Sequence, residues 1–354
     1  KSTPGGSGLI QALLDPANII PDFQTALNGS PTSHQVKVNR LPRNTESDVR
    51  EGHQCVPGEP RDITEQLIDS STFYKSDVAF QITESQLVGY CEDLNRITTM
   101  AGSDAAEVLS TMGESVMFDP NFSHFSQVFN LVASQLNGLR NKMNRNIAAK
   151  LISSLGINVA TGLNTPFSIP LLNLSDSSKR EEAIQILGDH LLLNQVSGGY
   201  LLVGIGNLHH FVTSYNYGCC NASGLDWDAM ATNSPFKYYR DICVGQEYGD
   251  RDFFLLLPLG ETQFVHRSYV LRNDSRGLIG KGIARGYIYD PLLPGVKYDI
   301  EVQHDSFRNG SFEVVYNIYI LSTYDVVITP EFAYDANDPM FGYNGILGYI
   351  GTKV

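Results

Sequence analysis

The sequence has 354 residues, which is enough for a substantial core and predicts two or three subdomains. Only 18% of the residues are charged, against the usual quarter, so either neighbouring molecules cover part of the surface or this is ordinary variation. The formal net charge of −13 argues against nucleic-acid binding by phosphate neutralisation, but an acidic wall is compatible with enclosing DNA that stays free to move.

The first 34 residues predict an arm. They open with KSTPGGSG and continue with prolines and an Asn-Gly-Ser turn, so one or two helical turns over Leu9–Leu14 are the only regular structure expected. Such a segment cannot build a core, and we expect it to be disordered or ordered by something else. The start at Lys1 predicts a removed leader or a numbering that begins at the first ordered residue.

Two extended segments flank a long polar excursion. Residues 35–41 predict one strand, and the alternation of Val78, Phe80 and Ile82 predicts another over Ser76–Thr83. The stretch between them is rich in Arg, Asp, Glu, Pro and Gly, and a loop of this length is often functional. It predicts a hairpin that projects from the body, with a mobile surface loop as the plainer alternative.

A long helix is the strongest local signal. Residues 84–120 predict mostly helix, and from Phe125 to Leu155 apolar residues then recur at spacings of three and four. Gly156 provides a stop, so the pattern predicts one amphipathic helix over 122–155, roughly 45–50 Å long. Its many Asn and Ser residues argue against a coiled coil.

The middle of the chain predicts short helices and strands in alternation. The predicted elements are a helix near Lys179–Asn194 capped by Ser175 or Asp176, a buried strand over Tyr200–Ile205, a helix over 207–215, a buried strand over Phe253–Leu257 and an extended segment over Gln263–Leu271.

The C-terminal part predicts β structure. Apolar residues alternate over 296–302 and again over 312–320, and Arg308-Asn309-Gly310 between them is typical of a hairpin turn. The return strand continues over Tyr324–Thr329, and the Gly-, Tyr- and Asn-rich tail over 333–354 predicts loop.

The sequence motifs that would indicate catalysis or ligand binding are each incomplete. Gly204-Ile205-Gly206 lies between a strand and a helix, but His209 replaces the third glycine of a dinucleotide fingerprint, so we expect a tight turn. Adjacent His209 and His210 indicate a pair on a helix surface and not a metal site. Gly280-Lys281 lacks the rest of a phosphate-binding loop.

The remaining candidates are equally weak. Asp335, Asn337 and Asp338 lack the spacing of a calcium loop, and no disulfide framework or zinc pair is predicted for the five cysteines, which are Cys55, Cys91, Cys219, Cys220 and Cys243. No run approaches 18 apolar residues and no signal peptide is visible. We therefore predict no catalytic, cofactor-binding or metal-binding residue, no cofactor and no membrane segment.

The order of elements resembles the HK97 fold of tailed-bacteriophage major capsid proteins. Three stretches carry local likeness: Tyr200–Ile205 followed by a helix, Phe254–Phe264, and 295–302 with its return strand 312–321. The resemblance implies an α+β, HK97-like capsid fold. It divides the chain into an N-terminal arm (1–34), an E-loop hairpin (35–90), a peripheral domain (91–198) with a spine helix (122–155), an axial domain (199–294), peripheral-domain strands (295–330) and a C-terminal tail returning toward the axial domain (331–354).

The resemblance also implies a function. The chain would be a non-enzymatic head protein whose hexamers and pentamers form an icosahedral shell around double-stranded DNA. The excursion at 42–74 would lie over one neighbour and the arm at 1–34 would wrap another. Portal, scaffolding, decoration and maturation-protease partners are implied, with assembly in the host cytoplasm and a final location in the virion. Lys1 fits removal of a leader by such a protease, and no Lys–Asn cross-link between subunits is assigned.

Two other functions stay open at this point. An encapsulin-like nanocompartment would use the same fold without packaging DNA, although the long arm favours a phage shell. A soluble enzyme with an unrecognised site is the alternative from another class, since missing motifs do not exclude catalysis.

Overall fold

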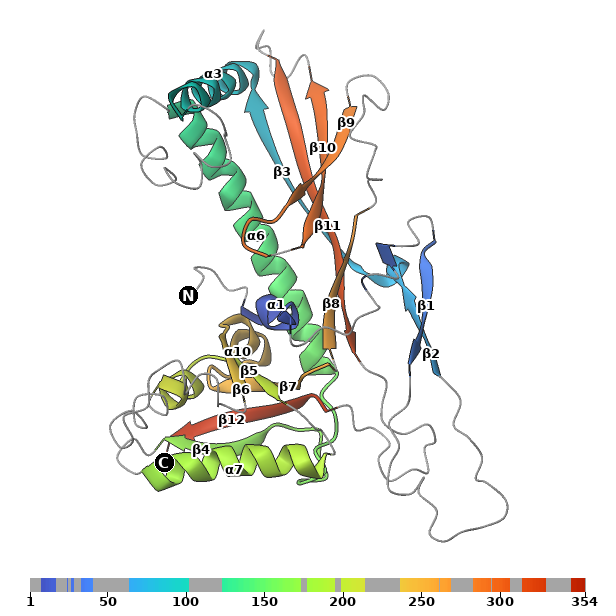
Figure 1. Cartoon of the computed structure of the whole chain (residues 1–354), viewed down its shortest axis with the longest axis vertical. Coiled ribbons are helices and arrows are strands. Elements are labelled where there is room, and N and C mark those ends of the chain that lie inside the picture. Colours follow the sequence, from blue (N-terminus) through green and yellow to red (C-terminus); the bar gives the residue numbers. More distant parts are fainter. Residues whose placement is uncertain are drawn as a thin grey trace. The chain divides into compact units, whose positions relative to one another are not determined.

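The computed structural model forms two compact units (Figure 1). It describes residues 8–16, 24, 27–28, 33–40, 64–101, 123–172, 177–194, 199–213, 236–260, 262–268, 283–293, 295–305, 314–328 and 345–353. Unit 1 comprises Lys1–Phe73, Met143–Val265 and Tyr324–Val354, and unit 2 comprises Tyr74–Lys142 and His266–Thr323. Helices and largely antiparallel sheets occur together, which confirms the predicted α+β class.

Unit 1 is built on a five-stranded sheet with the order β4–β12–β7–β5–β6. The strands are β4 (Phe167–Leu172), β12 (Leu347–Lys353), β7 (Phe253–Pro258), β5 (Tyr200–Gly204) and β6 (Phe236–Arg240). β5 and β7 are buried along their whole length, as their uninterrupted apolar runs predict. They pair antiparallel to each other, while β12–β4 and β5–β6 are parallel.

Helices cover both faces of this sheet. α7 (Ser177–Leu193) and the helical residues 207–213 pack on one face through Leu187, Leu191 and Phe211. α1 (Gly8–Leu13) contacts β5 and β6, and α10 (Cys243–Tyr248) contacts β5 and β7. Figure 1 shows α7 on one side of the sheet and α1 and α10 on the other. The sheet is therefore the centre of a three-layered core.

The predicted loop over 333–354 is wrong for its last part, because residues 347–353 form β12 in the interior of the sheet. Two glycines permit this position. A Cβ on Gly348 would lie 2.9 Å from the Phe253 ring, and one on Gly351 would lie 2.5 Å from Leu171 Cδ1. Glycine is a poor strand former by itself, but here close packing and two pairing partners outweigh propensity.

A two-stranded hairpin also belongs to unit 1. β1 (Gln35–Arg40) and β2 (Thr64–Asp69) pair antiparallel, with Gln35 opposite Asp69 and Arg40 opposite Thr64. β2 lies within the predicted excursion at 42–74 and pairs with the strand predicted over 35–41, whereas the strand predicted over Ser76–Thr83 pairs elsewhere and residues 41–63 lie outside the described residues. One face of the hairpin is buried through Val36 and Ile68, which join Leu27, Phe73, Val265 and Val327 in a small apolar cluster.

Unit 2 contains the second sheet, with the order β3–β11–β10–β9. Its strands are β3 (Tyr74–Thr83), β9 (Ile283–Tyr289), β10 (Lys297–Asp305) and β11 (Val315–Ile328), and β8 (Thr262–Arg267) also pairs with β11. β10 pairs antiparallel with β9 and β11, so the predicted late strands form a hairpin as expected. The turn predicted at 308–310 lies outside the described residues, and β11 contributes residues to both units.

Two helices accompany this sheet. α3 (Glu84–Ala101) is the described part of the helix predicted over 84–120, and α6 (Ser123–Ser153) confirms the long helix predicted over 122–155. Asp93 on α3 caps α6, since its Oδ2 accepts hydrogen bonds from the backbone N–H groups of His124 and Phe125, each at 3.1 Å. The start of α6 is therefore fixed by α3, which precedes it in the sequence.

Candidate functional site

The residues singled out for chemistry have ordinary structural surroundings. Gly206 adopts φ 72°, which confirms the tight turn predicted after β5. His210 is exposed on the helical residues 207–213, while His209 is partly buried and its Nδ1 lies 3.3 Å from the Tyr238 hydroxyl. Burial lowers the pKa of His209, with help from Arg240 and His210. This pair contacts a tyrosine and shows no arrangement for binding a metal.

The other sequence candidates are only partly described. Cys91 is exposed and Cys243 is buried, and neither forms a disulfide bond within the described residues. Within the described ranges, no group of three His, Cys, Asp or Glu side chains is placed to hold a metal ion. Of the helices in that same part of the chain, none is long and apolar enough to cross a membrane. The candidates outside the described residues are Cys55, Cys219, Cys220, Gly280, Lys281, Asp335, Asn337 and Asp338.

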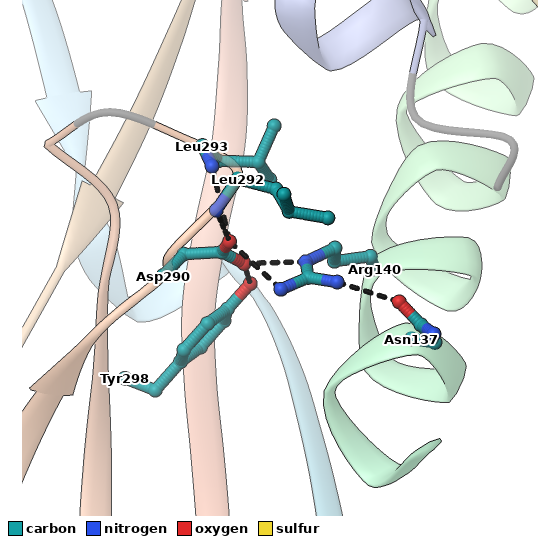
Figure 2. Close-up of polar contacts among 6 residues, drawn as sticks. All are labelled: Asn137, Arg140, Asp290, Leu292, Leu293 and Tyr298. Atoms are coloured by element: carbon teal, nitrogen blue, oxygen red, sulfur yellow. Dashed lines mark hydrogen bonds and ion pairs between the residues drawn. The ribbon is translucent and has the colours of Figure 1, made fainter. Parts of the chain in front are cut away.

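The most elaborate polar site of unit 2 centres on Asp290, just after β9 (Figure 2). Arg140 from α6 binds its carboxylate with two nitrogens, Nε at 2.7 Å and Nη2 at 2.9 Å. The Tyr298 hydroxyl donates at 2.6 Å, and the N–H groups of Leu292 and Leu293 donate at 2.7 and 3.0 Å. Asp290 thus accepts five hydrogen bonds, of which the two from Arg140 join α6 to the β9–β10 turn.

Burial decides the electrostatics of this site. The Arg140 and Asp290 side chains are 6% and 0% exposed. Burial by itself raises the pKa of Asp290, but the hydrogen bonds from Arg140, Tyr298 and Leu292 outweigh it and lower the pKa. Burial and the Asp290 charge raise the pKa of Tyr298. The carboxylate is therefore charged and the phenol neutral, which is the arrangement of a structural ion pair and not of a general acid or base.

In unit 1, the buried carboxylate of Asp241 caps two helices. Its Oδ1 accepts from the N–H groups of Cys243 and Val244 at the start of α10, at 2.8 and 3.1 Å. Its Oδ2 accepts from the N–H of Leu9 on α1 at 2.9 Å and from Asn144 Nδ2 at 2.7 Å. Asp241 is 1% exposed, and burial raises its pKa against the effect of these bonds.

The N-terminal segment 8–16 is consequently fixed to unit 1 of its own chain. Leu9, Ile10 and Leu13 are 0–1% exposed, and full burial of such side chains stabilises by about 1.5–3 kcal/mol each. Asp15 accepts a hydrogen bond from Tyr239 and pairs with Lys237 Nζ at 2.8 Å. Residues 8–16 of the arm expected over 1–34 thus pack on unit 1 of their own chain, and the wrapping of another subunit by the arm stays a prediction.

The far half of α6 is held in unit 1 in the same manner. Lys150 Nζ lies 2.7 Å from both carboxylate oxygens of Asp325 on β11. Asn146 Nδ2 donates to the Tyr324 hydroxyl at 2.8 Å. The polar face of α6 thus carries the side chains that fix the helix to strands, a role that the helical pattern could not reveal.

Several large apolar side chains of the described chain face solvent. Leu67 on the hairpin is 52% exposed and Tyr289 on β9 is 55% exposed. Leu163, Leu192 and Leu193 are 58%, 73% and 52% exposed. Single exposed apolar residues are common on soluble proteins, so these become candidate contact points only where another feature adds to them.

The stability of the chain is expected to fall in mild acid because of His266 on β8. Burial, with a smaller effect of Lys297, lowers the pKa of His266 from 6.5 to about 4. The folded state therefore favours neutral His266, and its stability contribution is present above pH 6.5 and lost as the pH falls toward 4. Moving from about pH 7.5 to about pH 5 should lower the free energy of unfolding by roughly 2 kcal/mol through this group.

Urea unfolding at the two pH values checks this expectation. His266→Gln should reduce the pH-dependent loss by most of that amount, whereas His210→Gln, at an exposed position, should leave it unchanged. An equal loss in the wild type and in His266→Gln would show that another group carries the pH dependence.

No protein-family model matches the sequence, and no curated protein matches it. A structure of Mycobacterium phage Che8 is similar over 96% of this chain and 91% of its own, at 10% identity and a TM-score of 0.43. The capsid of Myoviridae phage XM1 is similar over 99% and 94%, at 9% identity and a TM-score of 0.43.

The capsid of the cyanophage P-SCSP1u is similar over 90% of this chain and 83% of its own, at 9% identity and a TM-score of 0.38. The XM1 and P-SCSP1u structures are phage capsids, the class of protein that the sequence resembles.

Proposed function

We propose that this chain is a major capsid protein of a tailed bacteriophage, which self-assembles into an icosahedral shell around double-stranded DNA. The β1–β2 hairpin is the observation that supports this most directly. It is a two-stranded element with one face buried by Val36 and Ile68, and on its other face Leu67 is 52% exposed. A hairpin of two strands is marginal in water unless a further layer covers it. The small apolar cluster of unit 1 covers one face of this hairpin, and a neighbouring subunit would cover the other.

The base of the hairpin is rigid, which suits a projecting contact arm. Asp69 accepts hydrogen bonds from the Ser71 N–H at 2.8 Å and from Gln35 Nε2 at 3.1 Å. Hydrogen bonds from the Ser71 side chain, from Gln35 and from the Ser71 N–H lower the pKa of Asp69 to about 2, so the carboxylate is charged at neutral pH. The Ser70 N–H also donates to the His34 carbonyl at 2.8 Å, which closes the base of the hairpin.

The remaining elements suit the division into arm, E-loop, peripheral domain and axial domain, which stays a proposal. The proposed peripheral domain over 91–198 ends before β5, yet β4 and α7 share the sheet and core of β5 and β7. We therefore propose that the axial part of the subunit begins earlier than residue 199. Portal, scaffolding, decoration and protease partners, and a final location in the virion, belong to the same proposal.

The net charge of −13 disfavours tight binding between the proposed shell and the DNA inside it. An acidic subunit repels the phosphate backbone, so enclosed DNA would be confined by the wall and not held by basic contacts. Many weak contacts between subunits would together stabilise such a shell, since each further contact in a ring is formed at high effective concentration.

Replacing residues 41–63, which connect β1 to β2 in the sequence, is expected to block shell formation and leave the subunit folded. Arg40 and Thr64 are paired, so an Asn-Gly turn placed between them in exchange for residues 41–63 would keep the register of β1 and β2. Negative-stain electron microscopy should show closed particles for the wild type and none for the shortened chain. Circular dichroism and the urea unfolding midpoint should be nearly equal in the two proteins.

Two neighbouring point variants distinguish the exposed face of the hairpin from its buried face. Leu67→Asp changes the exposed face and should reduce the yield of particles without moving the unfolding midpoint, while Ile68→Asp, at a 5% exposed position, should destabilise the subunit. Normal particles from the shortened chain would refute the role assigned to the hairpin. Particles that enclose protein cargo and no DNA would instead identify an encapsulin-like compartment.

A further inference from the structure

A buried polar cluster joins three parts of unit 1 around His190. The imidazole is on α7 and its residue is 8% exposed. Its Nδ1 lies 3.2 Å from Nδ2 of Asn158, in the turn before β4, and 3.0 Å from the hydroxyl oxygen of Tyr349 on β12. One ring nitrogen therefore connects a helix, a turn and an interior strand.

The directions of these hydrogen bonds follow from Asn158. Its Oδ1 accepts from the Ala160 N–H at 3.1 Å and from Asn194 Nδ2 at 3.0 Å. A backbone N–H can only donate, so the Ala160 contact fixes which way the Asn158 amide points and leaves Nδ2 facing His190. Because Nδ2 also only donates, Nδ1 of His190 must be the acceptor, and the neutral ring carries its proton on Nε2.

A proton on Nδ1 would break this arrangement. Two N–H groups would then face each other across the Asn158 contact, and the amide cannot turn over without losing the Ala160 bond. The Tyr349 hydroxyl can reverse its bond, so the contact to the turn is the one that fails.

The surroundings of His190 oppose that proton under neutral conditions. Burial lowers the pKa of His190, and the Asp189 carboxylate on the same helix opposes this only in part. Tyr349 from β12 is kept neutral because burial raises its pKa. Phe167 from β4 meets the imidazole edge-on, with ring centroids 5.1 Å apart, and Asn158 from the turn is neutral. Asp189 is thus the charged group, among those described around the ring, that favours proton uptake.

We propose that His190 is a proton-sensitive latch, in which proton uptake at Nδ1 releases the turn at 158–163 from the end of α7 while the rest of unit 1 stays folded. The released parts carry Leu163, Leu192 and Leu193, which are 58%, 73% and 52% exposed. Opening the latch would therefore change the position of apolar side chains that already face solvent. The inference does not depend on the function proposed above.

Hydrogen exchange of the full chain, followed by mass spectrometry at about pH 7.5 and about pH 5, tests the latch. After correction for intrinsic rates, peptides covering 156–165 and 188–194 should lose protection about tenfold more than the rest of unit 1. In His190→Asn the side-chain oxygen replaces Nδ1 as an acceptor but takes up no proton, so this loss should disappear. His210→Asn is the matched control and should behave as the wild type, because His210 is exposed.

Two results would overturn the latch. One is an equal loss of protection in the wild type and in His190→Asn, or a loss spread evenly over unit 1. The other needs no variant: nitrogen NMR of the histidine-labelled chain should show Nδ1 of His190 without a proton at about pH 7.5, and a protonated Nδ1 there would contradict the assigned hydrogen bonds.

Discussion

Arg140→Ala is expected to lower the free energy of unfolding by about 3–5 kcal/mol, the usual effect of removing one partner from a buried ion pair. Asp290 would keep the bonds from Tyr298 and from two backbone N–H groups, but its 0% exposed charge would lose its only described cation. Urea unfolding followed by circular dichroism measures the loss. Because Arg140 helps to lower the pKa of Asp290, the variant should also lose stability at higher pH values during acid titration.

The β9–β10 pair of unit 2 offers a matched control for the Arg140 prediction. Arg285 Nε lies 2.8 Å from Glu301 Oε2, but the Arg285 side chain is 47% exposed. Arg285→Ala should therefore lower the free energy of unfolding by less than about 1 kcal/mol. Joining Arg140→Met with Asp290→Asn should destabilise less than the sum of the single changes, since no buried charge is left. Equal effects of Arg140→Ala and Arg285→Ala would contradict the role given to burial.

Asp241→Ala is expected to lower the free energy of unfolding by about 3 kcal/mol, because four donors lose their acceptor. Three of them are backbone N–H groups at the starts of α1 and α10, so both helices should lose protection in hydrogen exchange. Asp241→Asn keeps one acceptor oxygen and no charge. Its effect should be smaller, since burial already raises the pKa of Asp241 and disfavours the charged carboxylate.

Asp69 provides the comparison for this prediction. It also accepts from a backbone N–H, that of Ser71, but this hydrogen bond is exposed to solvent. Asp69→Ala should leave the unfolding midpoint almost unchanged and should not affect exchange in α1. If Asp241→Ala destabilised no more than Asp69→Ala, the carboxylate would not be the shared cap of α1 and α10.

The periodic elements of this chain could be predicted from the sequence because apolar spacing reports directly on burial. Phe125, Leu136 and Leu151 recur with helical spacing and are buried along α6, and the alternation over 296–302 and 312–320 marks β10 and β11. Runs without polar residues marked β5 and β7. These patterns also carried the resemblance from which the function was inferred.

Elements that depend on tertiary contacts escaped prediction. β4 contains Pro170, which a strand tolerates at the edge of a sheet, and β12 contains glycines that only close packing explains. β2, β6, β9 and α10 are short, and their local sequences carry no clear period. Their existence depends on partners far away in the chain, such as β10 for β9 and β1 for β2.

The polar anchors were also invisible in the sequence. Asp241 and Asp290 each lie directly after a strand, and their partners Asn144 and Arg140 are on the polar face of α6. A single carboxylate at a strand end is too common to predict a buried site. The polar residues of α6 were the signal that could have indicated these buried sites, because a helix of that length is expected to contact several strands.

The position of β12 has a consequence for the time at which unit 1 can form. Its neighbours in the sheet, β4 and β7, are made well before it during translation, and neither pairs with the other. The sheet of unit 1 therefore stays divided until residues 347–353 have left the ribosome. Because such long-range closure is slow, a nascent chain that has not yet exposed residues 347–353 should leave the apolar edges of β4 and β7 without their partner in the sheet.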